Sequence, residues 1–378
     1  MSANTLPAVG VVRQPRGLVQ LDGVTIPAWI EWSVTNNAYY EADTFRVKFA
    51  ESGLPAGYDA NWFSQQTETF AEIFGGIPAV PQIVDSSQLT SYIYGRADSI
   101  DYDPVERTIE ISGRDLTAAL IDKRLDMDYA NQTASQIVQS IASEHGLTAD
   151  VSNASDTTKA GTYFEIDVFK LQANRSEWDL LTYLARQQGY VVYVSGHTLY
   201  YGAFEPDTSA PYVIQWTTAK ASASGVPVAN VKRLKLSHTQ TVAKGISVTV
   251  RSASRYGSAA VQQSYPVSPR SIKAGASSPF GELQTYYYRA HAGMTAQQCA
   301  QLAESLYNSI ISHEMKMDAT LPGDDILTMQ SEIQLTGTGT LWDQVYYPKS
   351  ITRSMSFSDG YEMTVAAQNH SANLSSAP

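Results

Sequence analysis

Residues 176–202, SEWDLLTYLARQQGYVVYVSGHTLYYG, combine a capped helix, a glycine stop and a tight β-hairpin in one continuous run. Ser176 is followed three residues later by Asp179, which is close to the capping-box pattern at the start of a helix. Gly189 is placed to end that helix, because glycine adopts the left-handed conformation at little cost. Two strand-like runs then flank residues 195–197, which predicts a hairpin. Each signal has a structural explanation, so we interpret the run as a folding module and not as a reactive centre.

Two further amphipathic helices are predicted from apolar residues at helical spacing. The first lies within residues 131–146 and ends at a glycine. The second covers residues 295–312 and begins with a Thr-x-x-Gln capping box. Cys299 lies on the apolar stripe of this second helix, where we expect a small buried hydrophobic side chain rather than a nucleophile.

The rest of the chain has the alternation of β-strands. Residues 45–49 and 246–250 place apolar side chains at every second position, and turn-forming residues separate such segments. Residues 252–281 are rich in Ser, Ala, Gly and Pro, and we expect them to form a long loop. The pattern therefore predicts a small barrel or sandwich, a compact α+β module over residues 131–202, and a second β-rich part.

Composition limits the classes of protein that fit this chain. Only 17% of the 378 residues are charged, and tyrosines number 23 against 10 phenylalanines. Tyrosine suits half-buried strands and wet interfaces, because its ring is apolar and its hydroxyl forms hydrogen bonds. The net charge is −11, whereas a general nucleic-acid binder is expected to be basic. A single cysteine excludes an intrachain disulfide and a multi-cysteine zinc site.

Motif searches predict no catalytic, cofactor-binding or metal-binding residues. The six histidines are scattered, and no two stand at the i,i+4 spacing of a helical zinc site. The sequence has no GxSxG elbow, P-loop or Rossmann glycine pattern. It also has no signal-peptide pattern and no apolar run of about 18 residues, so no membrane segment is expected. These observations favour a binding or structural protein over an enzyme.

Particular residues leave other readings open. Asp101 with Asp103, and Asp324 with Asp325, are carboxylate pairs, and a glycosidase needs two carboxylates across a cleft. Both pairs flank turns, where aspartate bonds its own backbone. The basic stretch VKRLKL at 231–236 either blocks aggregation at a strand edge or contacts an acidic partner or nucleic acid. The alternatives to a structural protein are a cell-wall hydrolase and, from the tyrosine content, a glycan-binding protein.

Three blocks of the sequence, taken together, resemble a known family. Residues 94–122, YGRADSIDYDPVERTIEISGRDLTAALID, resemble the first block of tail hub proteins of contractile-tailed phages. This is the late-control-protein-D-like family, which is related to the N-terminal hub part of VgrG spikes. Residues 177–202 resemble its middle block, and residues 303–368 resemble its C-terminal block, in which a helix leads into a strand, a PGD turn and a final hairpin. The order and spacing of the blocks agree over most of residues 30–370.

The resemblance implies a β-rich α+β fold. It would contain two related antiparallel β-barrel domains, tube-like in form, and an inserted small α+β module. We expect the first barrel at residues 1–124, completed by 203–238, and the module at 125–202. The second barrel is expected at 239–378, with a helix near 295–312.

The resemblance also implies a function without catalysis or a cofactor, namely the structural hub of a phage tail baseplate. Three copies would form a pseudo-sixfold ring that joins the sixfold tail tube to the threefold central spike. Expected partners are further copies of the chain, the spike, the tail tube or a tube-initiator protein, and baseplate wedge or adaptor proteins. Tape-measure protein and DNA would pass through the channel without sequence-specific binding, which an acidic protein favours because like charges repel. The protein is expected in the virion, after assembly in the cytoplasm of the host bacterium.

One departure from the related spikes affects the expected partners. VgrG proteins continue into an OB-like domain and a β-helical needle, and neither is recognised before Pro378. We therefore expect a separate spike protein. No lysozyme segment is recognised either, although a tail-associated cell-wall hydrolase and a glycan-binding tail protein remain the alternative functions.

Overall fold

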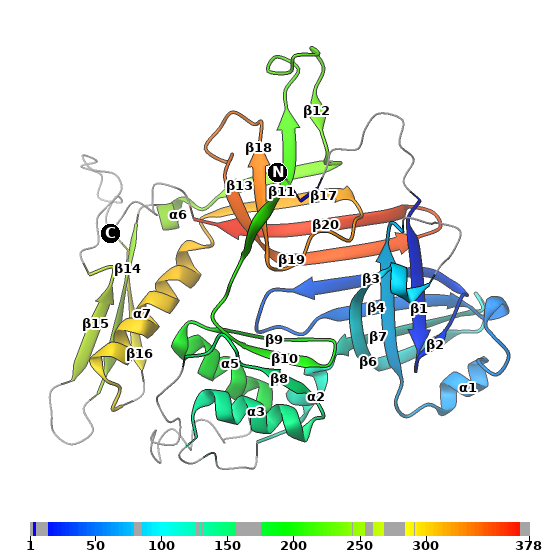
Figure 1. Ribbon diagram of the computed structural model, residues 1–378, viewed down its shortest axis with the longest axis horizontal. Coiled ribbons are helices and arrows are strands. Elements are labelled where there is room, and N and C mark those ends of the chain that lie inside the picture. Colours follow the sequence, from blue (N-terminus) through cyan, green and yellow to red (C-terminus); the bar gives the residue numbers. More distant parts are fainter. Residues whose placement is uncertain are drawn as a thin grey trace.

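The computed structural model has a β-rich α+β fold in which strands dominate (Figure 1). It describes residues 3–4, 14–78, 85–125, 129, 132–155, 175–243, 245–253, 260–267, 284–290 and 292–370. The expected long loop at 252–281 falls largely outside these residues, although a short strand occupies part of it.

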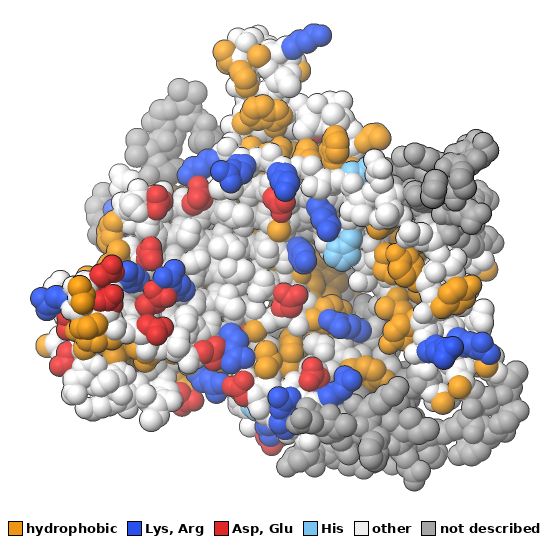
Figure 2. Space-filling model, turned by 180° about the vertical axis from the view of Figure 1, so that it is seen from behind, with side chains coloured by type: hydrophobic (Ala, Val, Ile, Leu, Met, Phe, Trp, Pro, Cys, Tyr) orange, Lys and Arg blue, Asp and Glu red, His pale blue; other side chains and the backbone are white. Residues whose placement is uncertain are grey.

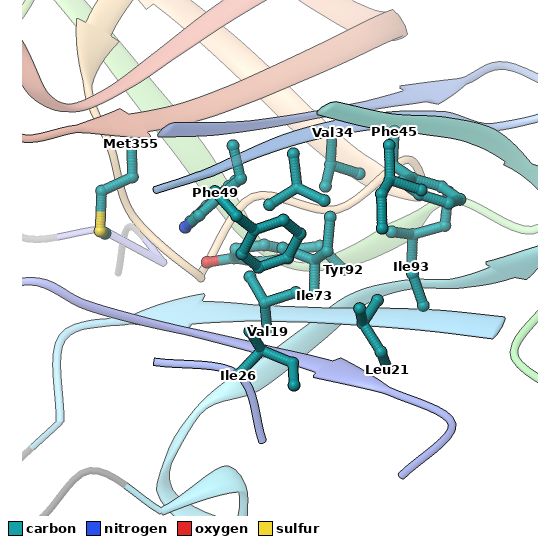
Figure 3. Close-up of a cluster of buried hydrophobic side chains, with 14 of the residues drawn as sticks. Val19, Leu21, Ile26, Val34, Phe45, Phe49, Ile73, Tyr92, Ile93 and Met355 are labelled. Atoms are coloured by element: carbon teal, nitrogen blue, oxygen red, sulfur yellow. The ribbon is translucent and has the colours of Figure 1, made fainter. Parts of the chain in front are cut away.

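The first part of the chain forms one half of a 14-stranded sheet. Side chains from six of its strands meet in a single core, so this half curls around that core (Figure 3). A short helix, α1 (Ala60–Gln65), packs its Phe63 against the same core. The strands are β1 (Arg16–Leu21), β2 (Val24–Thr25), β3 (Trp29–Asn37), β4 (Thr44–Ala50), β5 (Phe70–Gly76), β6 (Thr90–Asp103) and β7 (Thr108–Asp115).

The second half of the sheet is built from later strands and has a core of its own. It lies above the first half in Figure 1. Its strands are β11 (Asp207–Thr217), β12 (Val228–Ala229), β13 (Arg233–His238), β17 (Met315–Pro322), β18 (Ser331–Thr336), β19 (Val345–Ser356) and β20 (Gly360–Asn369).

The strand pairing differs from the expected boundary after the module. Residues 203–238 were expected to complete the first barrel, but β11 pairs in parallel with β18, and β13 pairs with β17. The physical reason is that Tyr212 and Ile214, on the inner face of β11, are buried in the second core.

A second difference concerns the start of the expected second barrel. Within 239–378, a separate three-stranded sheet forms, with α7 (Ala296–Ile311) packed on β14 and β15. The apolar face of β14 is buried with Cys299 under this helix rather than in the second core. The sheet consists of β14 (Ile246–Ser252), β15 (Val261–Tyr265) and β16 (Gln284–Ala290), and the short helix α6 (Gln240–Ala243) precedes it.

The inserted module forms as the opening run of sequence predicts. Ser176 caps α5 (Glu177–Gln188) and forms a capping box with Asp179, and Gly189 ends the helix at a φ of 69°. The hairpin follows directly, with Gly196 at a φ of 54° in its turn. The hairpin is β9 (Val191–Ser195) and β10 (Thr198–Gly202), and α3 (Ala134–Glu144) and β8 (Thr148–Asp150) complete the expected range. α2 (Thr117–Asp122) lies before the expected start at residue 125 but belongs to the module, because Leu120 is buried in its core.

β19 joins the two halves of the sheet into one. It pairs with β20 in the second half and, over residues 350–356, with β3 in the first half. Its inward side chains pass from one core to the other, because Ile351 belongs to the second core and Met355 to the first. Figure 3 shows Met355 at one end of the first core.

We predict that Met355→Ala lowers the free energy of unfolding by about 2 kcal/mol or more, because Met355 is buried and its removal leaves a cavity. Urea unfolding followed by tryptophan fluorescence measures the change. Val105→Ala is the matched control, since Val105 is 90% exposed, and should have little effect. Equal stability of the two variants would show that β19 does not anchor the first core.

Candidate functional site

The seam between the two halves is held by a buried arginine. Arg353 is 3% exposed and lies on β19 between Ile351 and Met355. Its Nε donates to the carbonyl of Asp324 (3.0 Å), and its two terminal nitrogens donate to the carbonyl of Leu327 and to the side chain of Asn36. A buried charge needs such partners, because it has left water.

A turn after β17 supplies the acceptors for this arginine. Asp324 is 4% exposed, and its carboxylate accepts hydrogen bonds from the Tyr212 hydroxyl (2.6 Å) and the backbone N–H of Ile326 (3.2 Å). Its carbonyl also accepts from the Tyr361 hydroxyl (2.8 Å), which lies 2.5 Å from the Tyr92 hydroxyl. Burial raises the pKa of Tyr92 to about 12, so both tyrosines stay neutral.

Two carboxyl groups lie buried beside the seam. Burial, together with the charge of Asp43, raises the pKa of Asp115 to about 8, and burial raises that of Asp43 to about 6. Asp43 accepts from the Asn36 amide (2.7 Å) and the backbone N–H of Asn37 (2.7 Å), and Asp115 accepts from the backbone N–H of Thr117 (3.1 Å). Asp115 is therefore mostly protonated at neutral pH. The backbone N–H of Asp115 also donates to the carbonyl of Asp43 (3.0 Å), which connects the β3–β4 turn to the segment before α2.

Two hollows open where the module meets the seam. A cavity of about 210 Å³ is lined by Asp43, Asp115 and Arg353 together with residues of the module. A second hollow, of about 130 Å³, lies beside it and is lined by aromatic and acidic side chains. Tyr39 and Tyr193 line both, and the Tyr193 hydroxyl accepts a hydrogen bond from the Gln330 amide (3.0 Å).

The two carboxylate pairs that the sequence suggested lie in different parts of the structure. Asp103 is exposed on the β6–β7 turn, where it accepts from the backbone N–H groups of Val105 and Glu106, which lowers its pKa. Asp324 is buried in the seam as a structural acceptor, and Asp325 lines the larger cavity. The residues that do gather here, Asp43, Asp115 and Arg353, were missed by sequence reasoning.

Three of the described histidines have a local side-chain partner. His145 pairs with Glu177 (2.5 Å), His238 pairs with Glu314 (3.2 Å), and the His197 ring lies 4.5 Å from that of Tyr94. His291 lies outside the described residues. Within the described ranges, no three His, Cys, Asp or Glu side chains are grouped to hold a metal ion.

The basic stretch lies at an edge of the large sheet. Lys232 pairs with Glu362 (2.8 Å), whereas Arg233 and Lys235 are exposed on β13. β13 pairs with β17 on one side, and charged side chains on such an edge oppose further strand pairing. No helix in the described part of the chain is long and apolar enough to span a membrane.

We predict that Asp115→Asn flattens the dependence of stability on pH. Between about pH 4 and about pH 8, folded Asp115 holds a proton that the unfolded chain has lost, so the stability of the native sequence falls as the pH rises through this window. At pH 8 the variant should be more stable by a few kcal/mol, since each pKa unit corresponds to about 1.4 kcal/mol. Urea unfolding at about pH 5 to about pH 8 measures how the free energy of unfolding depends on pH in the native sequence and in the variant.

Asp103→Asn is the control for this prediction. The pKa of exposed Asp103 is lowered, so its contribution to stability is present at neutral pH and is lost only in acid. An unchanged slope in Asp115→Asn would contradict the assignment of Asp115 as a buried acid.

Comparisons with known proteins place the fold. No family model and no curated protein matches the sequence. A tail protein from Neisseria meningitidis MC58 is 12% identical, with a TM-score of 0.67 over 94% of this chain and 96% of that one. The 43 kDa tail protein of prophage MuSo2 from Shewanella oneidensis is 15% identical, with a TM-score of 0.64 over 94% and 98%.

A secretion protein has a more distant likeness. The E. coli c3393 protein, a component of the type VI secretion system with structural similarity to the T4 bacteriophage tail proteins gp27 and gp5, is 10% identical. Its TM-score is 0.53 over 94% of this chain and 77% of that one. The chain therefore has the fold of phage tail proteins, as the resemblance of its three sequence blocks implies.

Proposed function

We propose that the protein is the hub of a phage tail baseplate. Three copies form a pseudo-sixfold ring, in which the two halves of each large sheet occupy successive positions around a central channel. The ring joins the sixfold tail tube to the threefold central spike. The likeness in fold to tail proteins supports this proposal, as do the two separate cores of one joined sheet.

The observation that carries the proposal is a polar wall across the join. Cross-strand neighbours share one face of a sheet, and five threonines follow one another on five neighbouring strands, with none of them buried. Thr352 and Thr35, at the join itself, are hydrogen bonded (3.0 Å). The row runs through Arg233, Thr320, Thr364, Thr352, Thr35, Thr44 and Arg114.

Such a wall suits the lining of a channel. The threonine hydroxyls are wetted but uncharged, and the row has cations only at its two ends, where Arg114 pairs with Asp98 (2.6 Å) and Arg233 is exposed. A passing polyanion therefore meets no cation along the five threonines. Figure 2 shows a broad white area on the back of the molecule, neither charged nor hydrophobic, between patches of mixed charge. The net charge of −11 further opposes adsorption of DNA.

The same proposal fixes the partners and the setting of the protein. The ring contacts a central spike, a tail tube or tube-initiator protein, and baseplate wedge or adaptor proteins. Tape-measure protein and DNA pass through it without sequence-specific binding. The ring assembles in the host cytoplasm, acts in the virion and catalyses no reaction.

We predict that the purified chain, at the concentration reached in assembly, has three times the mass of one chain by light scattering. Electron microscopy should resolve a ring with an open bore, and purified tails should contain it beside a spike and a tube protein. A stable monomer that does not co-purify with tails would contradict the hub. Clearing of peptidoglycan in a zymogram, abolished by Asp324→Asn in a folded variant, would favour the hydrolase instead.

A second prediction concerns the wall. With Cys299 buried, Thr364→Cys introduces one reactive thiol on the threonine row. In the assembled ring we expect it to react with a small maleimide but much more slowly with a large polyethylene-glycol maleimide. In the isolated chain both reagents should react.

Val105→Cys, on the exposed β6–β7 turn, is the matched control for reagent quality. Its thiol should react with both maleimides in the isolated chain. Free access of the large reagent to Thr364→Cys in the ring would show that the threonine row faces outward.

A further inference from the structure

We propose that the smaller hollow binds a cationic side chain, an arginine in preference to a lysine, carried by an extended segment of a partner protein. We call this hollow the aromatic pocket. It is lined by Tyr39, Tyr193, Tyr200 and Phe204, with Asp150 and Glu205 at the same site. The inference does not depend on the hub proposal, because it concerns one chain and not the ring.

The rings of the aromatic pocket pack against one another in a fixed arrangement. Tyr193 and Tyr200 are stacked, with centroids 4.7 Å apart and planes 11° apart. Tyr39 lies 5.3 Å from Tyr193 and 5.2 Å from Phe204, and Phe204 lies 6.1 Å from Tyr347. The four rings that define the pocket are half-buried, so part of their surface is open to a ligand. Aromatic rings held in this way attract cations through their negative faces.

Charge gives the pocket its selectivity. Asp150 accepts hydrogen bonds from the backbone N–H (3.0 Å) and hydroxyl (2.6 Å) of Ser152, which lowers its pKa and keeps it ionised. Glu205 is exposed in the connection from β10 to β11. Neither lysine nor arginine is among the residues that line the pocket in the described part of the chain. Among the described residues, the two carboxylates therefore have no cation beside them in the pocket lining.

The protein itself uses the same chemistry twice nearby. The guanidinium of Arg186, on α5 of the module, lies 4.8 Å from the centroid of the Tyr40 ring, and that of Arg353 lies 4.6 Å from the centroid of the Tyr92 ring in the seam. In both cases the chain supplies the cation and the ring. The aromatic pocket offers equivalent rings and adds carboxylates, and no described lysine or arginine lines it, so the cation can come from another molecule.

The geometry of the occupant follows from these surroundings. A guanidinium is planar, stacks on a ring and donates to a carboxylate through two N–H groups at once, whereas an ammonium is a compact point charge. A volume of about 130 Å³ admits one such side chain and excludes a folded element. Because Glu205 lies in an exposed connection, the segment that carries the arginine can approach in an extended form.

The test uses the full chain and two short peptides, acetyl-Gly-Gly-Arg-Gly-Gly-amide and the same peptide with citrulline in place of arginine. Citrulline has nearly the same shape but no charge. Titration followed by nuclear magnetic resonance of tyrosine-labelled protein should show saturable shifts of Tyr193 and Tyr200 with the arginine peptide. The citrulline peptide should bind at least about tenfold more weakly, because it cannot form charge-assisted hydrogen bonds.

Matched variants distinguish binding in the pocket from electrostatic attraction by the net charge of the protein. Glu205→Gln should weaken binding of the arginine peptide about tenfold and leave binding of the citrulline peptide unchanged. Asp207→Asn removes an exposed carboxylate two positions away that does not line the pocket, and it should have little effect. Tyr200→Ala should weaken binding of both peptides.

Three outcomes would overturn the proposal. Equal binding of the two peptides would show that charge is not recognised. An equal effect of Glu205→Gln and Asp207→Asn would show attraction by net charge alone. Shifts of Tyr193 and Tyr200 with neutral oligosaccharides, but not with the arginine peptide, would assign the rings to a glycan. A monomeric chain that still binds the arginine peptide would contradict the hub while supporting the pocket.

Discussion

The passage of β19 from one core to the other is the constraint on which the rest of the structure depends. Its inward positions are apolar at Ile351 and Met355 but cationic at Arg353, where the two cores meet. The turn at 324–327 leaves the strand ladder there and exposes carbonyl groups that need donors. Arg353 supplies these donors without breaking the alternation of the strand. One residue therefore satisfies the turn and closes the seam between the cores.

The polar character of the seam also explains what gathers around it. Apolar packing alone holds two surfaces together in many relative positions, whereas directed hydrogen bonds hold them in one. Asn36 shows this directly, because its amide joins Asp43 to Arg353 and so ties the β3–β4 turn to β19. The larger cavity lies at this point, because Asn36, Asp43 and Arg353 all line it.

The sequence predicts local structure well and long-range pairing poorly. The caps at Ser176 and Thr295 and the stop at Gly189 form as predicted, because neighbouring residues determine them. The placement of 203–238 differs, since either half of the sheet could accept apolar alternation at Tyr212 and Ile214. Asp324 has the sequence of a solvated turn, and only its tertiary contacts bury it. Arg353 did carry a signal, because its alternation with Ile351 and Met355 places it on the inner face of a strand.

The pairing of β3 with β19 also has a consequence for synthesis. Thr35 and Thr352, which are hydrogen bonded across it, are separated by 317 positions along the chain. The ribosome releases the first half of the sheet long before its partner strand exists, so β3 keeps an unpaired side until residues 350–356 have been made. Contacts of such high sequence separation slow folding and leave edges open to wrong partners. A chain that ends before residue 350 would lack the strand that closes the seam, so the first half of the sheet would keep an open edge at β3.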